Sequence, residues 1–254
     1  MYDWRDTGGL YNPLLPYEHF VAIQKTMVCQ RLDHKCADIC ILTTHPPTIT
    51  LGARSLREQL SHIHPLPPYI AAADTAILDD KLLKQTRSFL RRSYNIDLVK
   101  TNRGGSVWYH DRGVLQLYLI MEVQPFGISD IVYPLEEALL RTLTDIGITA
   151  SRADQSVRRM DKSFLGLWTN EKKIAGIGMR VESSDGRFVS MFGASLNINP
   201  YLPACNLIDP CGIPHRQMTS VVRELHNDYN ANDIRLTSLL YEHISNVFDV
   251  VIIE

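Results

Sequence analysis

The chain has 254 residues, of which 45% are hydrophobic and 21% are charged, a composition typical of a protein with a core of its own. Its formal net charge of −2 lacks the basic surplus that a general nucleic-acid binder needs, so we expect no nucleic-acid partner. No apolar run is long enough to span a bilayer, and the first residues, MYDWRDTGG, resemble neither a secretory signal nor a transit peptide. The odd number of cysteines, five, fits a reducing compartment. We therefore expect a cytoplasmic protein without a membrane partner.

The first part of the chain alternates helical and strand patterns. Residues 16–32 carry apolar side chains at helical spacing, among them Phe20 and Ile23, which predicts an amphipathic helix. Two short strands are expected at 39–44 and 48–52, because β-branched and apolar residues dominate both stretches. The prolines between them lack the backbone donors needed to continue a ladder.

A basic face is expected on the next helix, predicted for residues 71–92 from its composition. Lys81, Lys84, Arg87 and Arg91 fall three or four residues apart and therefore share one side of a helix. Such a run is either a solvated face or a docking surface for an acidic partner.

Two adjacent glycines separate the following strands, predicted at 97–101 and 106–109. Gly104 and Gly105 form either a hairpin turn, which is the simpler interpretation, or a loop that brings backbone N–H groups to a ligand. The next strand, at 114–123, is apolar almost throughout, which predicts cover on both faces.

The second half of the chain predicts a helix at about 131–146 capped by Ser129, then three strands, then a helix at 233–246. Turn-forming residues separate the strands, which predicts an antiparallel meander. The expected strands are 163–169, 172–182 and 187–198. The fold class is therefore α+β, or mixed α/β, and in the absence of a linker we expect residues 1–254 to form a single domain.

One cysteine, Cys211, lies between a proline and a glycine in the stretch IDPCGIP. Pro210 fixes its own backbone angle and Gly212 relieves the steric limits on the next residue, so the thiol is expected on a sharp turn. A small buried hydrophobe in a loop is the alternative interpretation for a lone cysteine.

Several short motifs follow one another along the chain: HPPTITLG, RGGSVWYH, KIAGIG, MFGASLN and PCGIP. In this order they resemble the lipoyl(octanoyl) transferase family, octanoyl-[acyl carrier protein]:protein N-octanoyltransferases of the biotin/lipoate ligase superfamily. The resemblance implies a larger mixed sheet flanked by helices, together with a small sheet. It also implies an acyltransferase of protein lipoylation, which moves an octanoyl or lipoyl group from acyl carrier protein to a lysine of a lipoyl domain.

The resemblance implies that Cys211 carries the acyl group as a thioester and that Lys173 stands beside it. The other motif residues are expected to line the acyl site: Arg103, Gly104, Gly105, Ser106, Val107, Trp108, Tyr109, His110, Gly176, Ile177, Gly178, Gly193, Ala194 and Ser195. The implied acceptors are lipoyl-domain proteins, namely 2-oxoacid dehydrogenase subunits and the glycine cleavage H protein. No cofactor and no metal ligand are expected.

The chemistry of the pair Cys211 and Lys173 is reasonable on its own terms. Attack on a thioester needs a thiolate, and a free cysteine with a pKa near ~8.5 is mostly protonated at neutral pH. A neighbouring ammonium group favours the thiolate and lowers that pKa. After acylation of the thiol, the lysine can serve as the base for the incoming amine.

Three departures from the family pattern keep alternatives open. Asp111 follows Tyr109 and His110 at a position where the family has glycine, and this YHD sequence is closer to the ATP-using lipoate ligases. The carboxylate of Asp111 could help hold a metal ion. Thr44 stands where the family has an acidic residue, and the stretch 54–103 is longer by about one helix, the basic one. The alternatives are an ATP-dependent lipoate-protein ligase and a catalytically silent module that binds carrier protein.

Overall fold

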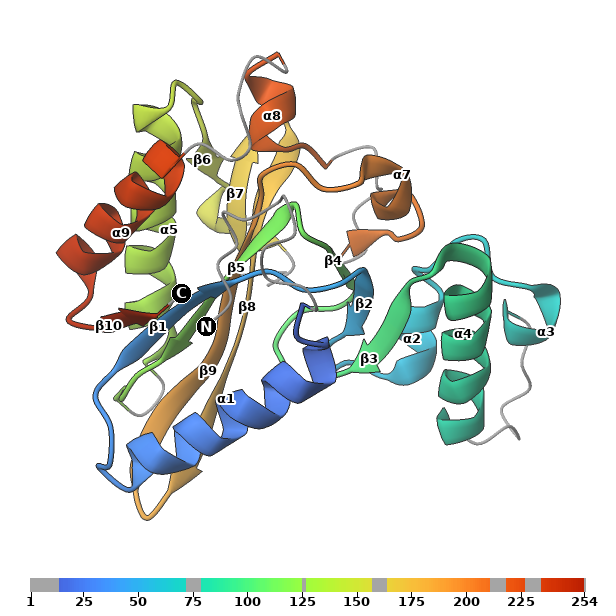
Figure 1. Cartoon of the computed structure of the whole chain (residues 1–254), viewed down its shortest axis with the longest axis horizontal. Helices are drawn as coiled ribbons and strands as arrows, with labels where there is room; N and C mark the ends of the chain where they lie inside the picture. Colours follow the sequence, from blue (N-terminus) through green and yellow to red (C-terminus); the bar gives the residue numbers. More distant parts are fainter. Residues whose placement is uncertain are drawn as a thin grey trace.

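The computed structural model of the chain describes residues 14–71, 79–124, 127–156, 164–210, 218–226 and 234–253 (Figure 1). Within these residues the strands form a seven-stranded mixed sheet and a separate three-stranded sheet. The order across the large sheet is β10 (Val251–Ile253), β1 (Ile39–Thr43), β5 (Val114–Ile120), β9 (Arg187–Asn197), β8 (Lys172–Ser184), β7 (Gly166–Thr169) and β6 (Ser151–Arg152). The order across the small sheet is β3 (Asp97–Lys100), β2 (Thr48–Leu51) and β4 (Trp108–His110). The expected fold class, α+β with a larger and a smaller sheet, is confirmed.

The meander of β7, β8 and β9 is antiparallel, as predicted. Its two turns contain paired residues with positive φ, Asn170 and Glu171 in one and Asp185 and Gly186 in the other. Two-residue turns of this kind match the right-handed twist of the strands that they join. Every residue of β5 is buried, so this strand is covered on both faces, also as predicted.

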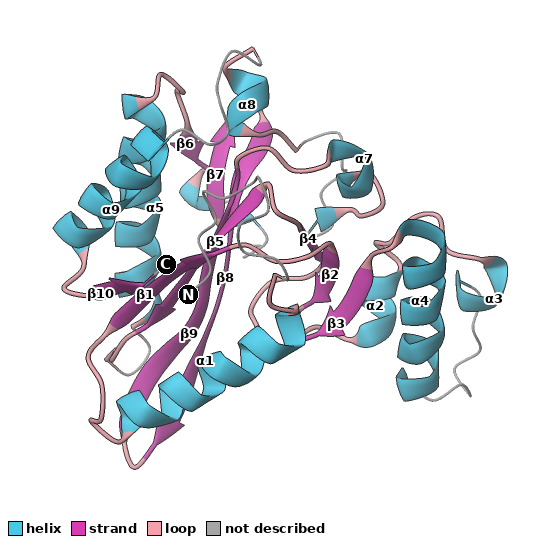
Figure 2. Cartoon of the chain, viewed as in Figure 1, coloured by secondary structure: helices cyan, strands magenta, loops and turns pink. Residues whose placement is uncertain are grey.

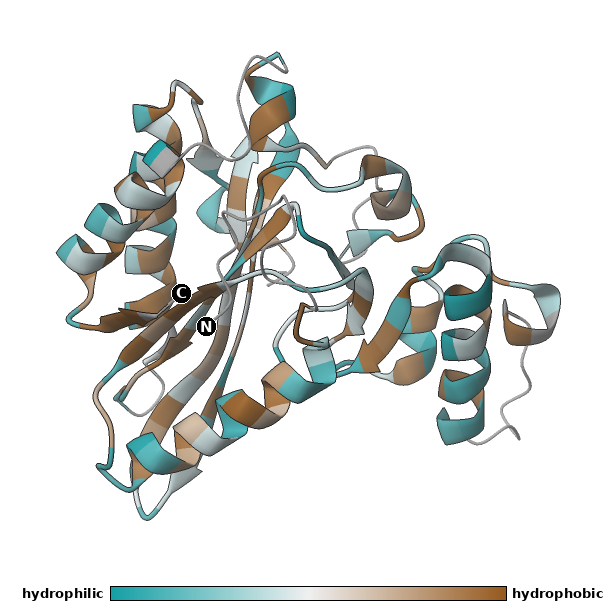
Figure 3. Ribbon diagram, viewed as in Figure 1, coloured by the Kyte–Doolittle hydropathy of each residue, from teal (hydrophilic) through white to brown (hydrophobic). Residues whose placement is uncertain are grey.

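Helices cover both faces of the large sheet (Figure 2). On one face α5 (Ile128–Asp145) and α9 (Ile234–Val247) lie side by side and share a core with the strands. On the other face α1 (Tyr17–Leu32) packs against β9 and β5. Hydrophobic residues dominate β1 and β5 between these layers (Figure 3). Among the described helices, none is both long and apolar enough to cross a membrane.

The buried side of α1 differs from the predicted one. Phe20 is buried as expected, but Ile23 is 39% exposed, and the inward row consists of Tyr17, Phe20, Gln24 and Val28. These residues follow the 3.6-residue period of the helix, whereas Ile23 lies about 100° away from Gln24 around the axis. A polar residue, Gln24, therefore takes a core position that the apolar pattern assigned elsewhere.

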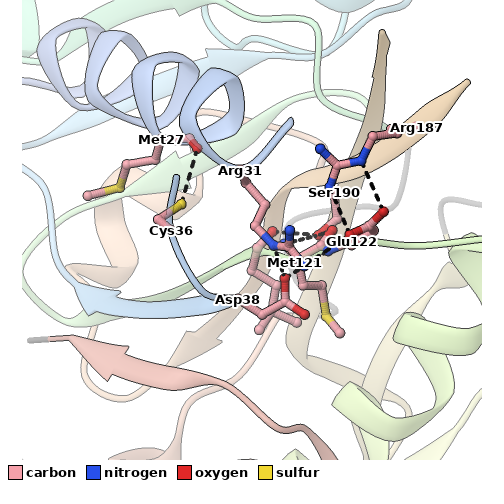
Figure 4. A network of polar contacts seen from close by, with 9 residues as sticks. Met27, Arg31, Cys36, Asp38, Met121, Glu122, Arg187 and Ser190 are labelled. Atoms are coloured by element: carbon pink, nitrogen blue, oxygen red, sulfur yellow. Dashed lines mark hydrogen bonds and ion pairs between the residues drawn. The ribbon is translucent and has the colours of Figure 1, made fainter. Parts of the chain in front are cut away.

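A network of charged groups fastens the C-terminal end of α1 to the large sheet (Figure 4). Arg31 pairs with Asp38 and with Glu122, at 3.0 Å for the latter. Glu122 also pairs with Arg187 on β9 at 2.9 Å, and its backbone N–H donates to Asp38 at 2.9 Å. Because these groups come from four separate segments, they fix the direction in which α1 crosses the sheet.

The small sheet has its own core, covered by α2 (Leu56–Leu60), α3 (Pro68–Ala71) and α4 (Asp79–Tyr94). The hairpin interpretation of the two adjacent glycines is wrong, because β3 and β4 do not pair with each other. Both flank β2, β3 in parallel and β4 antiparallel. The glycine loop is a crossover between the two edges of this sheet.

Two helical predictions need adjustment. The helix predicted to start near Ile131 begins at Ile128 with Gly127 as its N-cap, so Ser129 lies inside the first turn and does not cap it. The basic helix corresponds to α4, although residues 72–78 lie outside the described part of the chain. The chain after β9 continues through α7 (Leu202–Cys205) and α8 (Val221–Glu224).

The basic face of α4 is partly neutralised by carboxylates. Arg87 donates to Asp97 at 2.6 and 2.9 Å, and Arg91 donates to the same carboxylate at 2.9 Å. Lys81 and Lys84 are exposed. The part of this face that can meet a partner is therefore its lysine end.

Candidate active site

A narrow cavity of about 430 Å³, counting its open mouth, lies where the two sheets meet. Its walls combine the start of α1, the glycine loop, β4 and the central strands of the large sheet. The lining residues are Tyr17, Arg103, Gly105, Trp108, His110, Gln116, Tyr118, Lys173, Gly176, Ile177, Gly178, Phe192, Gly193, Ala194 and Ser195. Most of the site residues predicted from the sequence are therefore gathered around one space.

Strand register explains why the glycines of β8 and β9 line the cavity. Gly176 pairs with Ser195, and Gly178 pairs with Gly193. A β-carbon at Gly178 would lie 2.8 Å from the Gly104 carbonyl oxygen, and one at Gly176 would lie 2.9 Å from the ring of Trp108. Glycine is needed at both positions because the small sheet and its loop approach the backbone of β8 this closely.

The glycine loop joins the two sheets directly. The Gly104 N–H donates to the Met179 carbonyl oxygen at 3.0 Å, and Gly105 has a φ of +83°. The Gly104 N–H is therefore already hydrogen-bonded within the protein. Four residues of the predicted site do not line the cavity, namely Gly104, Ser106, Val107 and Tyr109. Val107 and Tyr109 point instead into the core of the small sheet, as strand alternation requires.

Arg103 supplies a buried cation to the cavity wall and is 7% exposed. Its guanidinium donates to the Thr50 hydroxyl at 2.7 Å, to the Thr50 carbonyl at 3.0 Å and to the Gly104 carbonyl at 3.0 Å. Burial raises the pKa of Tyr17 above its usual value, although the nearby Arg103 charge acts in the opposite direction. The guanidinium is thus held rigidly between the small sheet and α1.

Two buried histidines stay neutral beside this cation. His45 Nε2 lies 2.8 Å from the Tyr118 hydroxyl, and His110 Nε2 lies 2.9 Å from the Thr50 hydroxyl. Burial lowers the pKa of His45 to about 4, and burial together with the His45 and Arg103 charges lowers that of His110 well below its usual value. At neutral pH these imidazoles add hydrogen-bonding capacity without adding charge.

Lys173 lies at the start of β8 and is 1% exposed. Its Nζ is 5.8 Å from the centre of the Trp108 ring and 5.4 Å from that of Trp168, distances at which an aromatic face attracts a cation. Its backbone forms a parallel bridge with Met218 and accepts a hydrogen bond from the Thr219 N–H at 3.0 Å. Cys211 lies outside the described residues, and the described chain resumes at Met218, next to Lys173.

Asp111, the residue that favoured a metal-dependent ligase, does not line the cavity. One carboxylate oxygen accepts the Gly113 N–H and the other accepts the Tyr201 N–H, each at 2.8 Å. Burial raises the pKa of this carboxyl, although the hydrogen bonds oppose the shift. Asp111 therefore ties the turn between β4 and β5 to the segment after β9.

Four cavity residues were not predicted from the sequence: Tyr17, Gln116, Tyr118 and Phe192. Gln116 and Tyr118 alternate on β5 and pair with Ser195 and Gly193, so they extend the two glycine rows across the sheet. The alternation of side chains along a strand next to the motifs was a signal from which Gln116 and Tyr118 could have been predicted. Tyr17 and Phe192 reach the cavity through the placement of α1 and through an irregular backbone, which no local pattern reveals.

The sequence matches the family model described as lipoyl protein ligase A/B catalytic domain over residues 16–240. A curated octanoyltransferase of Desulforamulus reducens is 29% identical over 92% of this chain and 88% of its own length. One from Chloroflexus aggregans is 32% identical over 80% of this chain and 78% of its own length. The expected class of enzyme, an acyltransferase, is confirmed by these relatives.

Solved structures agree on the fold. A crystal structure of lipoate-protein ligase A bound with ATP has a TM-score of 0.61 at 15% identity and covers 91% of this chain and 85% of its own. A bipartite lipoate protein ligase from Thermoplasma acidophilum, solved in a study of that ligase and its E2 lipoyl domain, has a TM-score of 0.60 at 12% identity and covers 91% and 83%. The chain belongs to the lipoyl protein ligase A/B catalytic domain family.

Proposed function

We propose that this chain is an octanoyltransferase that takes an octanoyl group from acyl carrier protein and passes it to a lysine of a lipoyl domain. Cys211 carries the acyl group between the two substrates as a thioester, and Lys173 serves that thiol. The residues that line the cavity hold the acyl chain. The curated relatives that span most of this chain carry the name of this activity.

The burial of Lys173 is the observation that carries the proposal. Burying a lysine to 1% exposure at the edge of a cavity has a large desolvation cost. An apolar residue would occupy this position in the strand without that cost, so the choice of lysine favours a functional role. The backbone that follows the PCGIP segment is fixed to this same residue through Met218 and Thr219. This pairing supports a position for Cys211 within reach of the lysine.

The transfer proceeds in two balanced steps. The Cys211 thiolate attacks the carbonyl carbon of the donor thioester and forms a new C–S bond. The bond between that carbon and the carrier sulfur breaks, and the carrier leaves as a thiol after its sulfur takes up a proton. The acceptor amine then attacks the acyl-Cys211 carbonyl, a C–N bond forms, and the cysteine sulfur leaves. Lys173, as an ammonium group, stabilises the first thiolate by charge and gives its proton to the leaving carrier sulfur. As a neutral amine it then accepts the proton that the acceptor amine loses in the second step, so it ends protonated, as it began.

The cavity suits a saturated chain. Four glycines line it together with the apolar side chains of Trp108, Ile177, Phe192 and Ala194, so apolar surface is available to an alkyl chain. The buried histidines are neutral for the physical reasons given above, so Arg103 is the charged group on that wall. A carbonyl or thioester oxygen can lie near a cation of this kind, while the alkyl chain follows the glycines.

Intact-mass analysis after incubation with octanoyl-acyl carrier protein tests the proposal. The expected product carries one octanoyl group, which peptide mapping places on Cys211, and Cys211→Ser abolishes it. Cys205→Ser is the matched control, because Cys205 is 5% exposed and burial raises its pKa to about 12. Acylation of Cys205 or Cys29 in place of Cys211, or of none, would overturn the assignment.

The role of Lys173 is tested separately by alkylation. Lys173→Met keeps a side chain of similar length and removes the charge, so the pH at which iodoacetamide modifies Cys211 should rise and transfer should slow. Iodoacetamide rates measured against pH report this directly. Equal rates in a folded variant would show that Lys173 is a strand residue without influence on the thiol.

A further inference from the structure

Phe192 lines the cavity in a backbone conformation that phenylalanine seldom adopts. It has a φ of +66° within β9, where extended backbone is the rule. Its side chain is 1% exposed. Backbone outliers of this kind persist where the surroundings hold them in place, and they cluster at functional sites.

The strand register places Phe192 at the far end of the cavity from Lys173. Phe192 pairs with Met179, which lies roughly six residues beyond Lys173 along β8, or about 20 Å at the rise of a strand. An extended octanoyl chain measures about 9 Å from carbonyl carbon to methyl carbon at ordinary bond lengths. The Nζ of Lys173 lies 5.8 Å from the centre of the Trp108 ring, which packs against Gly176, so the reacting thioester is expected near Gly176. Met179, the partner of Phe192, lies three residues beyond Gly176, or about 10 Å at the rise of a strand, so the methyl end of the chain comes close to Phe192.

The ladder of backbone hydrogen bonds between β5 and β9 is interrupted at Phe192, and side chains supply hydrogen bonds in its place. The continuous pairing of the two strands ends at Tyr118 and Gly193 and resumes as a single bridge between Glu122 and Val189. The Phe192 N–H donates to Gln24 Oε1 at 3.2 Å, and the Ser190 hydroxyl donates to the Leu119 carbonyl at 2.8 Å. An amide from α1 thus supplies the acceptor that a neighbouring strand would normally provide.

Gln24 is held in place by its own burial and by the anchoring of its helix. It is fully buried on the inward row of α1, and the charged network of Figure 4 anchors the same helix through Arg31. A glutamine in a core position costs stability unless its polar atoms find partners. The Phe192 N–H satisfies Oε1 of Gln24, whereas Nε2 is buried without a hydrogen-bond partner among the described residues. The bond to Phe192 therefore accounts for one of the two polar atoms of this side chain.

Phe192 also differs in chemistry from the tyrosines near it. Tyr118 is tied through its hydroxyl to His45 at 2.8 Å, and the hydroxyl of Tyr17 lies near the charge of Arg103. The Phe192 ring carries no polar atom. It is therefore suited to contact the terminal methyl group of an acyl chain, whereas the two tyrosines present polar hydroxyl groups along the sides of the cavity.

We propose that the Phe192 ring is the end stop that sets the acyl-chain length accepted by the cavity, and that Gln24 is the positioning residue that holds it. This inference rests on the proposed function and adds the determinant of its substrate length. Removing the ring extends the cavity and admits longer chains, and enlarging it excludes octanoyl groups in favour of shorter ones.

Competition between hexanoyl, octanoyl, decanoyl and dodecanoyl carrier proteins tests the end stop. Phe192→Gly should raise the dodecanoyl-to-octanoyl ratio of kcat/KM by at least about tenfold, since one methylene in an apolar pocket is worth 10- to 200-fold. Glycine is chosen because it adopts the observed φ without strain. Phe192→Trp should shift the preference toward hexanoyl.

Met191→Ala is the matched control, since Met191 is fully buried in the same cluster but does not line the cavity. It should leave the length profile unchanged. Gln24→Leu should broaden the profile, whereas a merely structural role would lower the melting temperature and leave the ratio as it was. An unchanged ratio in a folded and active Phe192→Gly variant would overturn the inference.

A binding measurement separates this inference from the proposed function. Thermal shifts with saturated fatty acids from six to twelve carbons require no transfer. If the wild type transfers no acyl group at all, the proposed function fails, and the end stop still predicts a shift that is largest for octanoate in the wild type and for a longer acid in Phe192→Gly. The same optimum in both proteins would refute the end stop.

Discussion

Replacing Asp111 with asparagine tests whether this residue is a structural tie or a metal ligand. Its two carboxylate oxygens accept the N–H groups of Gly113 and Tyr201, each at 2.8 Å, and the residue is 7% exposed. An amide keeps one acceptor and turns a donor toward the other N–H. Leaving one buried donor unsatisfied costs about 1–3 kcal/mol.

At this chain length, about 2 kcal/mol corresponds to a fall in melting temperature of roughly 4–8 °C. Thermal unfolding followed by circular dichroism, with and without magnesium, measures it. Asp249→Asn is the control, because Asp249 is exposed and a surface change of this kind stays within about 0.5 kcal/mol. If Asp111→Asn melts like the wild type but loses a stabilisation by magnesium, the structural account of Asp111 is wrong.

Three further predictions concern stability, docking and the cavity wall. Burial raises the pKa of Asp97, but hydrogen bonds from two arginines outweigh it and hold the value at about 2, so its stabilisation is complete above pH 3.8 and is lost as the pH falls toward 2. Between pH 5 and pH 2.5 the wild type should lose about 1–2 kcal/mol more stability than Asp97→Asn after allowance for solvent screening, because the other carboxyl groups titrate in both proteins; an equal loss in the two would contradict this. Reversing the charges of Lys81 and Lys84 should slow association with acyl carrier protein and weaken its salt dependence at an unchanged melting temperature, whereas unchanged kinetics would mark a solvated face. Gly176→Ala should force the Trp108 ring to move, at a cost of about 1–3 kcal/mol and a slower transfer, and an unaffected rate would show that the ring yields freely.

The strands were the most predictable part of this fold. The run that forms β5 is apolar apart from Gln116, and the turns flanking β8 contain residues with positive φ, so local chemistry determines both. The buried row of α1 was less predictable, because Gln24 is buried to serve the backbone of Phe192, and that need arises only in the assembled sheet. Helix starts failed where tertiary placement, not a capping side chain, sets the boundary, as at Ser129.

The candidate site was predictable where it follows contiguous motifs. Gly176, Gly178 and Gly193 line the cavity because their spacing puts them on one face of paired strands. Val107 and Tyr109 were assigned to the site because they belong to the same motif, but both side chains pack into the core of the small sheet, Tyr109 from β4 and Val107 from the position just before it. Tyr17 comes from a distant helix, and its contribution depends on how α1 is anchored.

The most direct test of the octanoyltransferase assignment compares two reactions on one lipoyl domain. One contains octanoyl-acyl carrier protein without ATP or magnesium, and the other contains free octanoate with both. A thioester already holds an activated acyl group, so the transferase account predicts modification of the lipoyl domain in the first reaction and none in the second. Modification with free octanoate, ATP and magnesium but not with the carrier-protein thioester would contradict the account and favour the ATP-dependent ligase.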